Sequence, residues 1–319
     1  ALAEIAVKRA GDQPELVAAL TSQRALQALT DREVAEAIAL QREAAGLLAT
    51  QLGPDDLRVI TSNFRLALSL AVSGRYAEAE PLLRAAVAAR SRWLTPTHPE
   101  TLEAVETLGI CLHRMGRAAE AVPFLTGVLR AKEADLGRRD PALARPLDNL
   151  AGALHALHRD EEALALLRRS VALREANGSD DRVARPLVNL GTVLVALGRP
   201  AEGLSALQRA RDLFETGGRI DPYTRILVAL ALCALHRGHD ALAELAPIDE
   251  LPAEQRASFT GATLVVRGTA LLGLGDRVAA ARVLGETEHH PDRASWSDEI
   301  EAQLVADLAQ VRHNDTEKR

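Results

Sequence analysis

Two segments of this chain carry nearly the same series of residues, and this repetition restricts the fold more than any other feature. The first runs from Arg145 to Ala163 and the second from Arg185 to Gly203, and both open with Arg-Pro-Leu-x-Asn-Leu. A segment repeated at a fixed offset is typical of proteins built by stacking equivalent units. Apolar residues at i, i+3 and i+4 within each copy favour helices. The sequence therefore predicts an all-α protein of stacked helix-turn-helix units.

The period of these units can be counted along the chain. Glutamates that begin the second helix of a unit lie 42 residues apart, and the last follows after 40: Glu36, Glu78, Glu120, Glu162 and Glu202. A Gly-Arg or His-Arg pair ends each first helix, and Gly or Pro ends each second helix. We expect one array over residues 14–217, preceded in 1–13 by the end of another helix. Residues 218–288 are expected to form degenerate helical pairs, and 289–319 a capping helix with a frayed tail.

Within the degenerate region, prolines and glycines set the expected boundaries. We predict a short helix over 240–246 that Pro247 and Pro252 interrupt, followed by helices over 254–273 and 276–286. A final helix over 296–311 carries acidic residues, Asp307 among them, which suit the polar outer side of a cap.

Small residues recur where the two helices of a unit must cross closely. On the first helices these are Ala67, Gly109, Ala151 and Gly191, and on the second helices Ala79, Ala121, Ala163 and Gly203. A further close crossing is expected at Gly268. We expect leucines to fill the seam beside each of these crossings.

The repeated words resemble a known family. They are Asn-Leu-Ala and Asn-Leu-Gly at Asn149 and Asn189, a Gly-Arg-x-x-Glu-Ala turn, and a Leu-Gly-x-x-x-Pro connection. Together with the 42-residue period they resemble the tetratricopeptide repeat (TPR) of the kinesin-light-chain subtype, which is also common in bacterial multidomain proteins. The resemblance is strongest over residues 55–217, although aliphatic residues replace the usual aromatics of the first helix. It implies a right-handed α-solenoid of TPR units with a C-terminal capping helix.

Composition narrows the classes of partner and compartment. A net charge of -6 and only 8 aromatic residues argue against nucleic acid and anionic membrane surfaces. No apolar run is long enough to predict a membrane span. Cys111 and Cys233 lie within apolar helical segments, which favours a reduced, cytoplasmic chain over a disulfide framework. The chain opens at Ala1 in mid-helix without an initiator Met, as expected of a piece of a longer polypeptide or of a trimmed terminus.

Binding residues are expected on the concave surface that stacked first helices form. Arg145 with Asn149, and Arg185 with Asn189, lie four residues apart and therefore on one helix face. Asn can hold a peptide backbone through its donor and acceptor, and Arg can form a fork with a carboxylate. The resemblance implies that the asparagines contact bound peptide. Three further residues are expected on this surface: Arg65, His155 and Tyr223. The alternative, that these side chains are solvated or join neighbouring repeats, stays open.

Catalytic and cofactor motifs are missing from the sequence. There is no phosphate-binding Gly-x-x-x-x-Gly-Lys-Ser/Thr loop and no nucleophile elbow, and His113 and His155, 42 residues apart, lack a third metal ligand. We therefore expect no cofactor, no metal and no enzyme activity in this segment.

The leading hypothesis is a scaffold that binds a peptide or a partner helix in its groove. One alternative is the regulatory or sensor region of a longer bacterial enzyme or regulator, such as a Ser/Thr protein kinase or a nucleotide-binding transcriptional regulator. Another is self-association through exposed end helices.

Overall fold

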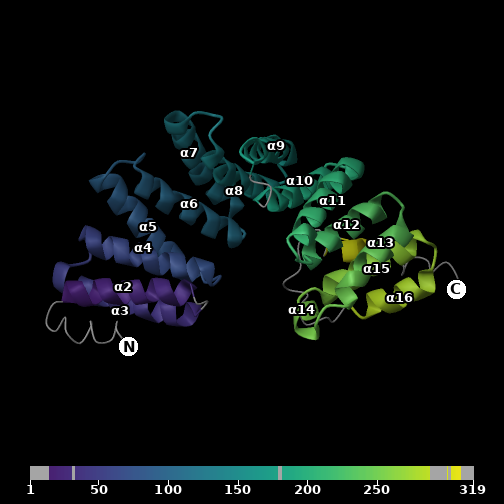
Figure 1. Cartoon of the computed structure of the whole chain (residues 1–319), viewed down its shortest axis with the longest axis horizontal. Helices are drawn as coiled ribbons and strands as arrows, with labels where there is room; N and C mark the ends of the chain where they lie inside the picture. Colours follow the sequence, from purple (N-terminus) through teal and green to yellow (C-terminus); the bar gives the residue numbers. More distant parts are fainter. Residues whose placement is uncertain (1–13, 31–32, 179–181, 288–299, 301–302, 310–319) are drawn as a thin grey trace. The chain divides into compact units, whose positions relative to one another are not determined.

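The computed structural model describes residues 14–30, 33–178, 182–287, 300 and 303–309 (Figure 1). These residues form helices and the turns between them, and no strand occurs among them. The chain divides into two compact units, residues 1–159 (unit 1) and 160–319 (unit 2), which are described separately. The expectation of an all-α repeat protein is confirmed.

Unit 1 consists of helical pairs that follow one another along the chain. Its described elements are α2 (Pro14–Thr30), α3 (Val34–Leu52), α4 (Leu57–Val72), α5 (Tyr76–Trp93), α6 (Pro99–Arg114), α7 (Ala118–Leu136), the 3-10 turn η1 (Pro141–Leu143) and α8 (Ala144–His155). The first helix of each pair packs on the second, α2 on α3, α4 on α5 and α6 on α7. Each second helix also packs on the next first helix, so the core is continuous along the unit.

Unit 2 repeats this arrangement with more irregular members. Its described elements are α9 (Asp160–Ala176), α10 (Ala184–Ala196), α11 (Pro200–Thr216), α12 (Pro222–Ala234), α13 (Gly238–Asp249), α14 (Ala253–Ala257), α15 (Thr260–Gly273) and α16 (Arg277–Gly285). The pairs are α10 with α11, α12 with α13 and α15 with α16. Residues 303–309 form a further short helix.

Two predicted boundaries in unit 2 are wrong. Pro247 lies inside α13, which continues to Asp249, because the fixed φ of proline is itself helical and only one backbone hydrogen bond is lost near the helix end. The single helix expected over 254–273 is broken after Ala257. The break lets Phe259 pack against the apolar core of the unit.

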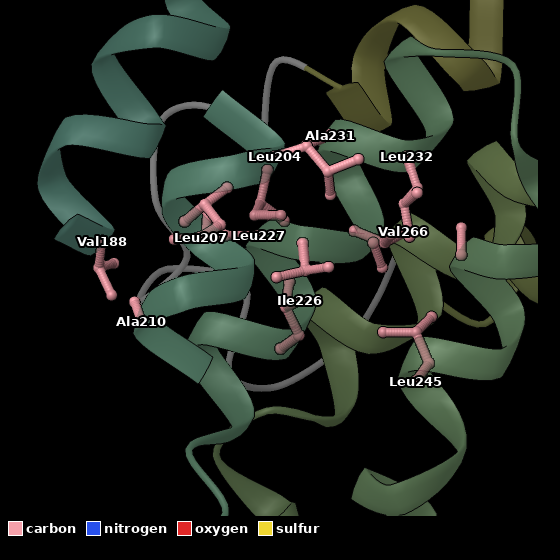
Figure 2. Close-up of a cluster of buried hydrophobic side chains, with 14 of the residues drawn as sticks. Val188, Leu204, Leu207, Ala210, Ile226, Leu227, Ala231, Leu232, Leu245 and Val266 are labelled. Carbon is pink, nitrogen blue, oxygen red and sulfur yellow. The ribbon is translucent and has the colours of Figure 1, made fainter. Parts of the chain in front are cut away.

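The close crossings predicted from small residues are confirmed. A Cβ atom added to Gly191 would lie 2.4 Å from Leu207 Cγ, and one added to Gly203 would lie 2.8 Å from the carbonyl oxygen of Gly191. At Gly109 and Gly268 the nearest atoms likewise belong to a leucine 16 residues later. Figure 2 shows the apolar cluster of unit 2, in which Leu207 and Leu227 lie close together. Leu125, Leu207 and Leu284 therefore fill the space between the two helices of their pairs.

The turn between the helices of a pair explains the Gly-Arg-x-x-Glu motif. Gly74, Gly116 and Gly198 have φ values of 77°, 76° and 70°, in the left-handed region that favours glycine. The Arg that follows is the N-cap residue of the second helix, and it pairs with the acidic residue three positions on. Equivalent pairs are Arg75–Glu78 (2.6 Å), Arg117–Glu120 (2.6 Å), Arg199–Glu202 (2.7 Å) and Arg237–Asp240 (2.7 Å). The Gly-Arg-x-x-Glu motif therefore determines the residue at which the second helix of each pair begins.

None of the described helices combines the length and the apolar composition that crossing a membrane requires.

Candidate functional site

One surface of each unit carries three of the predicted binding residues, Arg65, Asn149 and Asn189. The first helices from α4 onward each have a small residue at the crossing position, and we call the surface formed by the positions two before and one after it the first-helix face. In unit 1 these positions hold Arg65, Leu68, Thr107, Ile110, Asn149 and Gly152. In unit 2 they hold Asn189, Thr192, Leu227, Leu230, Val266 and Thr269. The position two before the crossing is polar in α4, α6, α8 and α10 and apolar in α12 and α15, so the chemistry of the face changes within unit 2.

A buried carboxylate organises the first-helix face of unit 1. Glu106 of α6 is 1% exposed, and its Oε2 accepts from Lys132 Nζ of α7 at 2.9 Å and from Arg145 Nη2 of α8 at 3.2 Å. Its Oε1 accepts from Asn149 Nδ2 at 3.0 Å. Both carboxylate oxygens are therefore satisfied, as a buried charge requires. Glu106 joins three helices of neighbouring pairs.

This network changes what Arg145 and Asn149 can offer to a ligand. The Asn149 amide nitrogen donates within the chain, and its side chain is half-buried. The Arg145 side chain is 67% exposed and has further N–H donors. Arg145 and Asn149 thus join neighbouring repeats, and they keep donors and an acceptor for a second partner. Sequence reasoning missed Glu106, although the acidic residues Glu106 and Asp148, at a position that holds Phe64 in α4 and Val188 in α10, were a usable signal.

Arg65 lies at a different kind of site on α4. Its side chain is exposed, with no hydrogen bond or ion pair to any described residue. Beside it, the buried Arg90 guanidinium lies 4.2 Å from the centre of the Phe64 ring and donates to the Glu100 carbonyl at 2.7 Å. Burial lowers the pKa of Arg90 and the positive charge of Arg65 lowers it further, while Glu100 and Glu103 raise it. This end of the face is therefore cationic.

His113 and His155 occupy equivalent positions near the ends of α6 and α8. Burial lowers the pKa of His113, with smaller contributions from Arg114 and His155. A Cβ atom added to Gly152 would lie 3.4 Å from His113 Nε2, so Gly152 leaves room for the ring. His113 Nδ1 is buried without a hydrogen-bond partner among the described residues. The described residues contain no group of three His, Cys, Asp or Glu side chains arranged to hold a metal ion.

In unit 2, Arg185 and Asn189 of α10 occupy the positions that Arg145 and Asn149 occupy on α8. Val188, next to Asn189 in sequence, is buried in the apolar cluster. Arg185 is exposed and Asn189 half-buried, and neither has a side-chain hydrogen bond to another described residue. Tyr223 lies at the start of α12, one helical turn before Leu227, and is 41% exposed. The three residues are accessible to a ligand.

A cavity of about 300 Å³ opens on the first-helix face of unit 2. Its lining comes from α10, α11, α12, α15 and the helix 303–309: Thr192, Val195, Ala196, Leu207, Leu227, Leu230, Cys233, Ala234, Thr269 and Gln303. Three first helices contribute to one apolar floor. Sequence reasoning did not identify this floor, because aliphatic residues on a helix face are equally typical of a core.

The helix 303–309 lies on this same face. In Figure 1 it is the yellow segment between the ribbons of α12 and α15. Asp307 accepts hydrogen bonds from the Thr269 hydroxyl and from Gln303 Nε2, the latter at 2.8 Å. The prediction that Asp307 lies on a polar outer side is wrong, because its side chain turns toward α15 and is only 4% exposed. The rest of the predicted cap, residues 289–299, 301–302 and 310–319, lies outside the described residues.

The two cysteines are thiols at neutral pH. Burial, with a smaller contribution from Glu80, raises the pKa of Cys111 to about 11. Burial, with a smaller contribution from Asp307, raises the pKa of Cys233 to about 12. A nucleophilic cysteine needs the opposite shift. Cys111 is completely buried, as expected of a small core residue, while Cys233 is half-buried.

Sequence models described as the tetratricopeptide repeat match residues 58–134, 105–176 and 188–258, which together exceed half of the chain. A comparison with curated protein sequences gave no significant match.

Solved structures share the fold. The TPR-like repeats of a protein described as a kinesin light chain from Podospora anserina are 23% identical over 65% of this chain and 99% of that one, with a TM-score of 0.56. BtubC (BKLC) from P. vanneervenii is 18% identical over 69% and 91%, also with a TM-score of 0.56. Aspartyl phosphate phosphatase F from Bacillus subtilis is 15% identical over 90% and 74%, with a TM-score of 0.65. The chain belongs to the tetratricopeptide-repeat family, and its fold is similar to that of kinesin-light-chain repeats.

Proposed function

We propose that this chain is a protein-interaction module that binds a peptide segment or a partner helix on the first-helix face of its repeats. The observation that carries the proposal is the cavity of about 300 Å³ on unit 2, whose apolar floor is formed by successive first helices. A concave apolar site with a few polar groups at its edge is the usual form of a binding site. Here Thr192, Thr269 and Gln303 supply those polar groups. Arg185, Asn189 and Tyr223 lie earlier on α10 and α12 and would extend the contact with a ligand along the same helices.

In unit 1 the proposed ligand contacts are polar. Arg145 and Arg65 present cationic groups, and Asn149 presents its Oδ1, while Glu106 holds Arg145 and Asn149 in place. A ligand with a carboxylate could form charge-assisted hydrogen bonds with either arginine. His155 follows Asn149 on α8, at the C-terminal end of the helix, and would border such a ligand.

A peptide-display selection on the full chain tests the proposal. We compare the wild type with Leu230→Asp, which places a charge on the apolar floor, and with Asn189→Ala, which removes a polar group one helical turn before Thr192 on α10. Val278→Asp is the matched control, because Val278 is 84% exposed on the second helix α16. We expect the wild type and Val278→Asp to enrich the same sequence motif, and both face variants to lose it.

Thermal unfolding of each variant shows whether the fold is kept. Asn189 has no side-chain hydrogen bond to another described residue, so Asn189→Ala should unfold at the wild-type temperature. Enrichment by all four proteins alike would place the binding surface elsewhere. No enrichment by the wild type would contradict a peptide-binding function.

A further inference from the structure

The described helix near the C-terminus buries one side only. Leu304 and Asp307 of the helix 303–309 are nearly inaccessible, whereas Val305 between them is 56% exposed. Positions i and i+3 lie on one face of a helix, and an amphipathic helix anchors itself in a groove by such a face. The segment therefore has the pattern of a ligand helix as well as that of a cap.

The surface that this helix covers is the surface proposed for partner binding. Thr269, which contacts Asp307, occupies the position on α15 that Thr192 occupies on α10. Gln303 lines the cavity together with Leu230 and Cys233 of α12. The helix 303–309 thus contacts the first-helix face at the position one after the crossing residue of α15, next to the cavity.

The contact between Asp307 and the face limits how tightly the helix docks. Its two partners, the Thr269 hydroxyl and the Gln303 amide, are both uncharged. A buried carboxylate without a cationic partner is costly to desolvate. A helix that served only as a permanent cap would be more stable with an apolar residue here. The buried carboxylate favours a helix that can leave the face.

We propose that the helix 303–309 is an internal ligand of the first-helix face of unit 2, and that the amphipathic helix of a protein partner replaces it. The partner helix would present an apolar residue at the position of Leu304 and a hydrogen-bonding side chain at the position of Asp307. This inference rests on the proposed function, since it names the ligand class of the same face.

The experiment uses Cys233 as a reporter in the full chain, labelled with a neutral thiol reagent at fixed pH. Cys233 lines the cavity beside Gln303, and the completely buried Cys111 reports on global unfolding. The test variant is Leu304→Ser, and the matched control is Val305→Ser, on the exposed side of the same helix. The probe is a synthetic peptide with the sequence of residues 299–311, and a second peptide carries Lys at the Leu304 position.

We expect Leu304→Ser to raise the labelling rate of Cys233 about tenfold or more, because loss of a buried leucine shifts a docking equilibrium by at least that factor. Val305→Ser should leave the labelling rate of Cys233 at the wild-type value, and the labelling rate of Cys111 should be the same in all variants. Added wild-type peptide should restore the protection of Cys233 in Leu304→Ser, and the Lys-containing peptide should not.

Three outcomes would overturn the inference. If Cys233 is labelled at the wild-type rate in Leu304→Ser, the helix does not cover the face. If Cys111 and Cys233 are labelled at equally increased rates, the helix is part of the core. Finally, the wild-type peptide could fail to protect Cys233 in Leu304→Ser. A display motif that is lost with Leu230→Asp would keep the proposed function in each case.

Discussion

Asn149 Nδ2 donates a hydrogen bond to Glu106 Oε1 at 3.0 Å, and this contact joins the first helices α6 and α8 of neighbouring pairs. A residue expected to contact ligand therefore also holds the repeats together. Lys132 and Arg145 complete the network from α7 and α8. Within unit 1, the geometry of the first-helix face depends on this buried carboxylate.

Replacing Glu106 by Ala should destabilise the chain by about 2 kcal/mol, because a cavity forms and three donors lose their common acceptor. Glu106→Leu should cost less than about 1 kcal/mol, since apolar residues fill the same position in α4, α10, α12 and α15 and replacing a buried charge network by apolar packing is often neutral. Urea unfolding followed by circular dichroism measures both. Equal losses for the two variants would show that the charge network matters more than the packing.

The helix crossing at Gly191 gives a matched pair of glycine variants. Gly191→Ala should destabilise the chain by about 1–3 kcal/mol, because the new Cβ would lie 2.4 Å from Leu207 Cγ. Gly127→Ala should stabilise it by about 0.5–1 kcal/mol, since Gly127 is exposed in the middle of α7 with free space around it. Thermal unfolding should separate the two with opposite signs, and shifts of the same sign would rule out the close crossing as the cause.

A larger side chain at another crossing tests the same geometry. Ala121 is completely buried between α6 and α7, so Ala121→Trp should wedge the pair apart and lower the unfolding temperature by several degrees. The measurement is differential scanning calorimetry, with Ala119→Trp on the exposed side of α7 as control. Wild-type stability of Ala121→Trp would contradict the crossing.

His236 occupies the turn position that glycine holds in other units. Its φ of 58° lies in the left-handed region, which is unfavourable for residues with a Cβ atom by about 1–2 kcal/mol. His236→Gly should therefore stabilise the chain. The gain should be smaller than this conformational cost, because glycine also raises the entropy of the unfolded chain. Gly116→Ala, at the equivalent turn, should destabilise it by about 1 kcal/mol. Denaturant unfolding of both variants checks the signs.

The docking of the helix 303–309 should depend on pH through Asp307. Burial raises the pKa of Asp307, although hydrogen bonds from Thr269 and Gln303 oppose the shift. The Thr269 hydroxyl also contacts the Val265 carbonyl at 3.0 Å, and its single proton can satisfy only one of its two neighbours. A protonated Asp307 completes this chain of hydrogen bonds.

Because the folded-state pKa is above the unfolded one, the contribution of protonated Asp307 is full below the unfolded value. It is lost as the pH rises through the raised pKa. Asp307→Asn should remove this dependence, and it should protect Cys233 from labelling better than the wild type does at neutral pH. Labelling profiles against pH, corrected for the ionisation of the thiol itself, measure the effect. Identical corrected profiles for the two proteins would exclude Asp307 as the titrating group.

Local signals made the repeat fold predictable from sequence. Glu36, Glu78, Glu120 and Glu162 lie 42 residues apart because the same turn sequence begins the second helix of each unit. Small residues such as Gly191 mark the positions where two helices are closest. The break before Phe259 and the passage of α13 through Pro247 were not predictable in this way, because packing against the core decided both.

The sequence by itself determined most of the helices, their pairing and the face on which Arg65, Asn149 and Asn189 lie, because these depend on residue spacing within a unit. Only the tertiary structure decided what those residues contact. The contacts of Glu106 with Lys132 and Asn149, and that of Asp307 with Thr269, join residues 26 to 43 positions apart in the sequence. No local sequence pattern specifies which residues meet over such separations. Burial in a shared core gives each of these polar groups its partner, and so determines which of them remain available to a ligand.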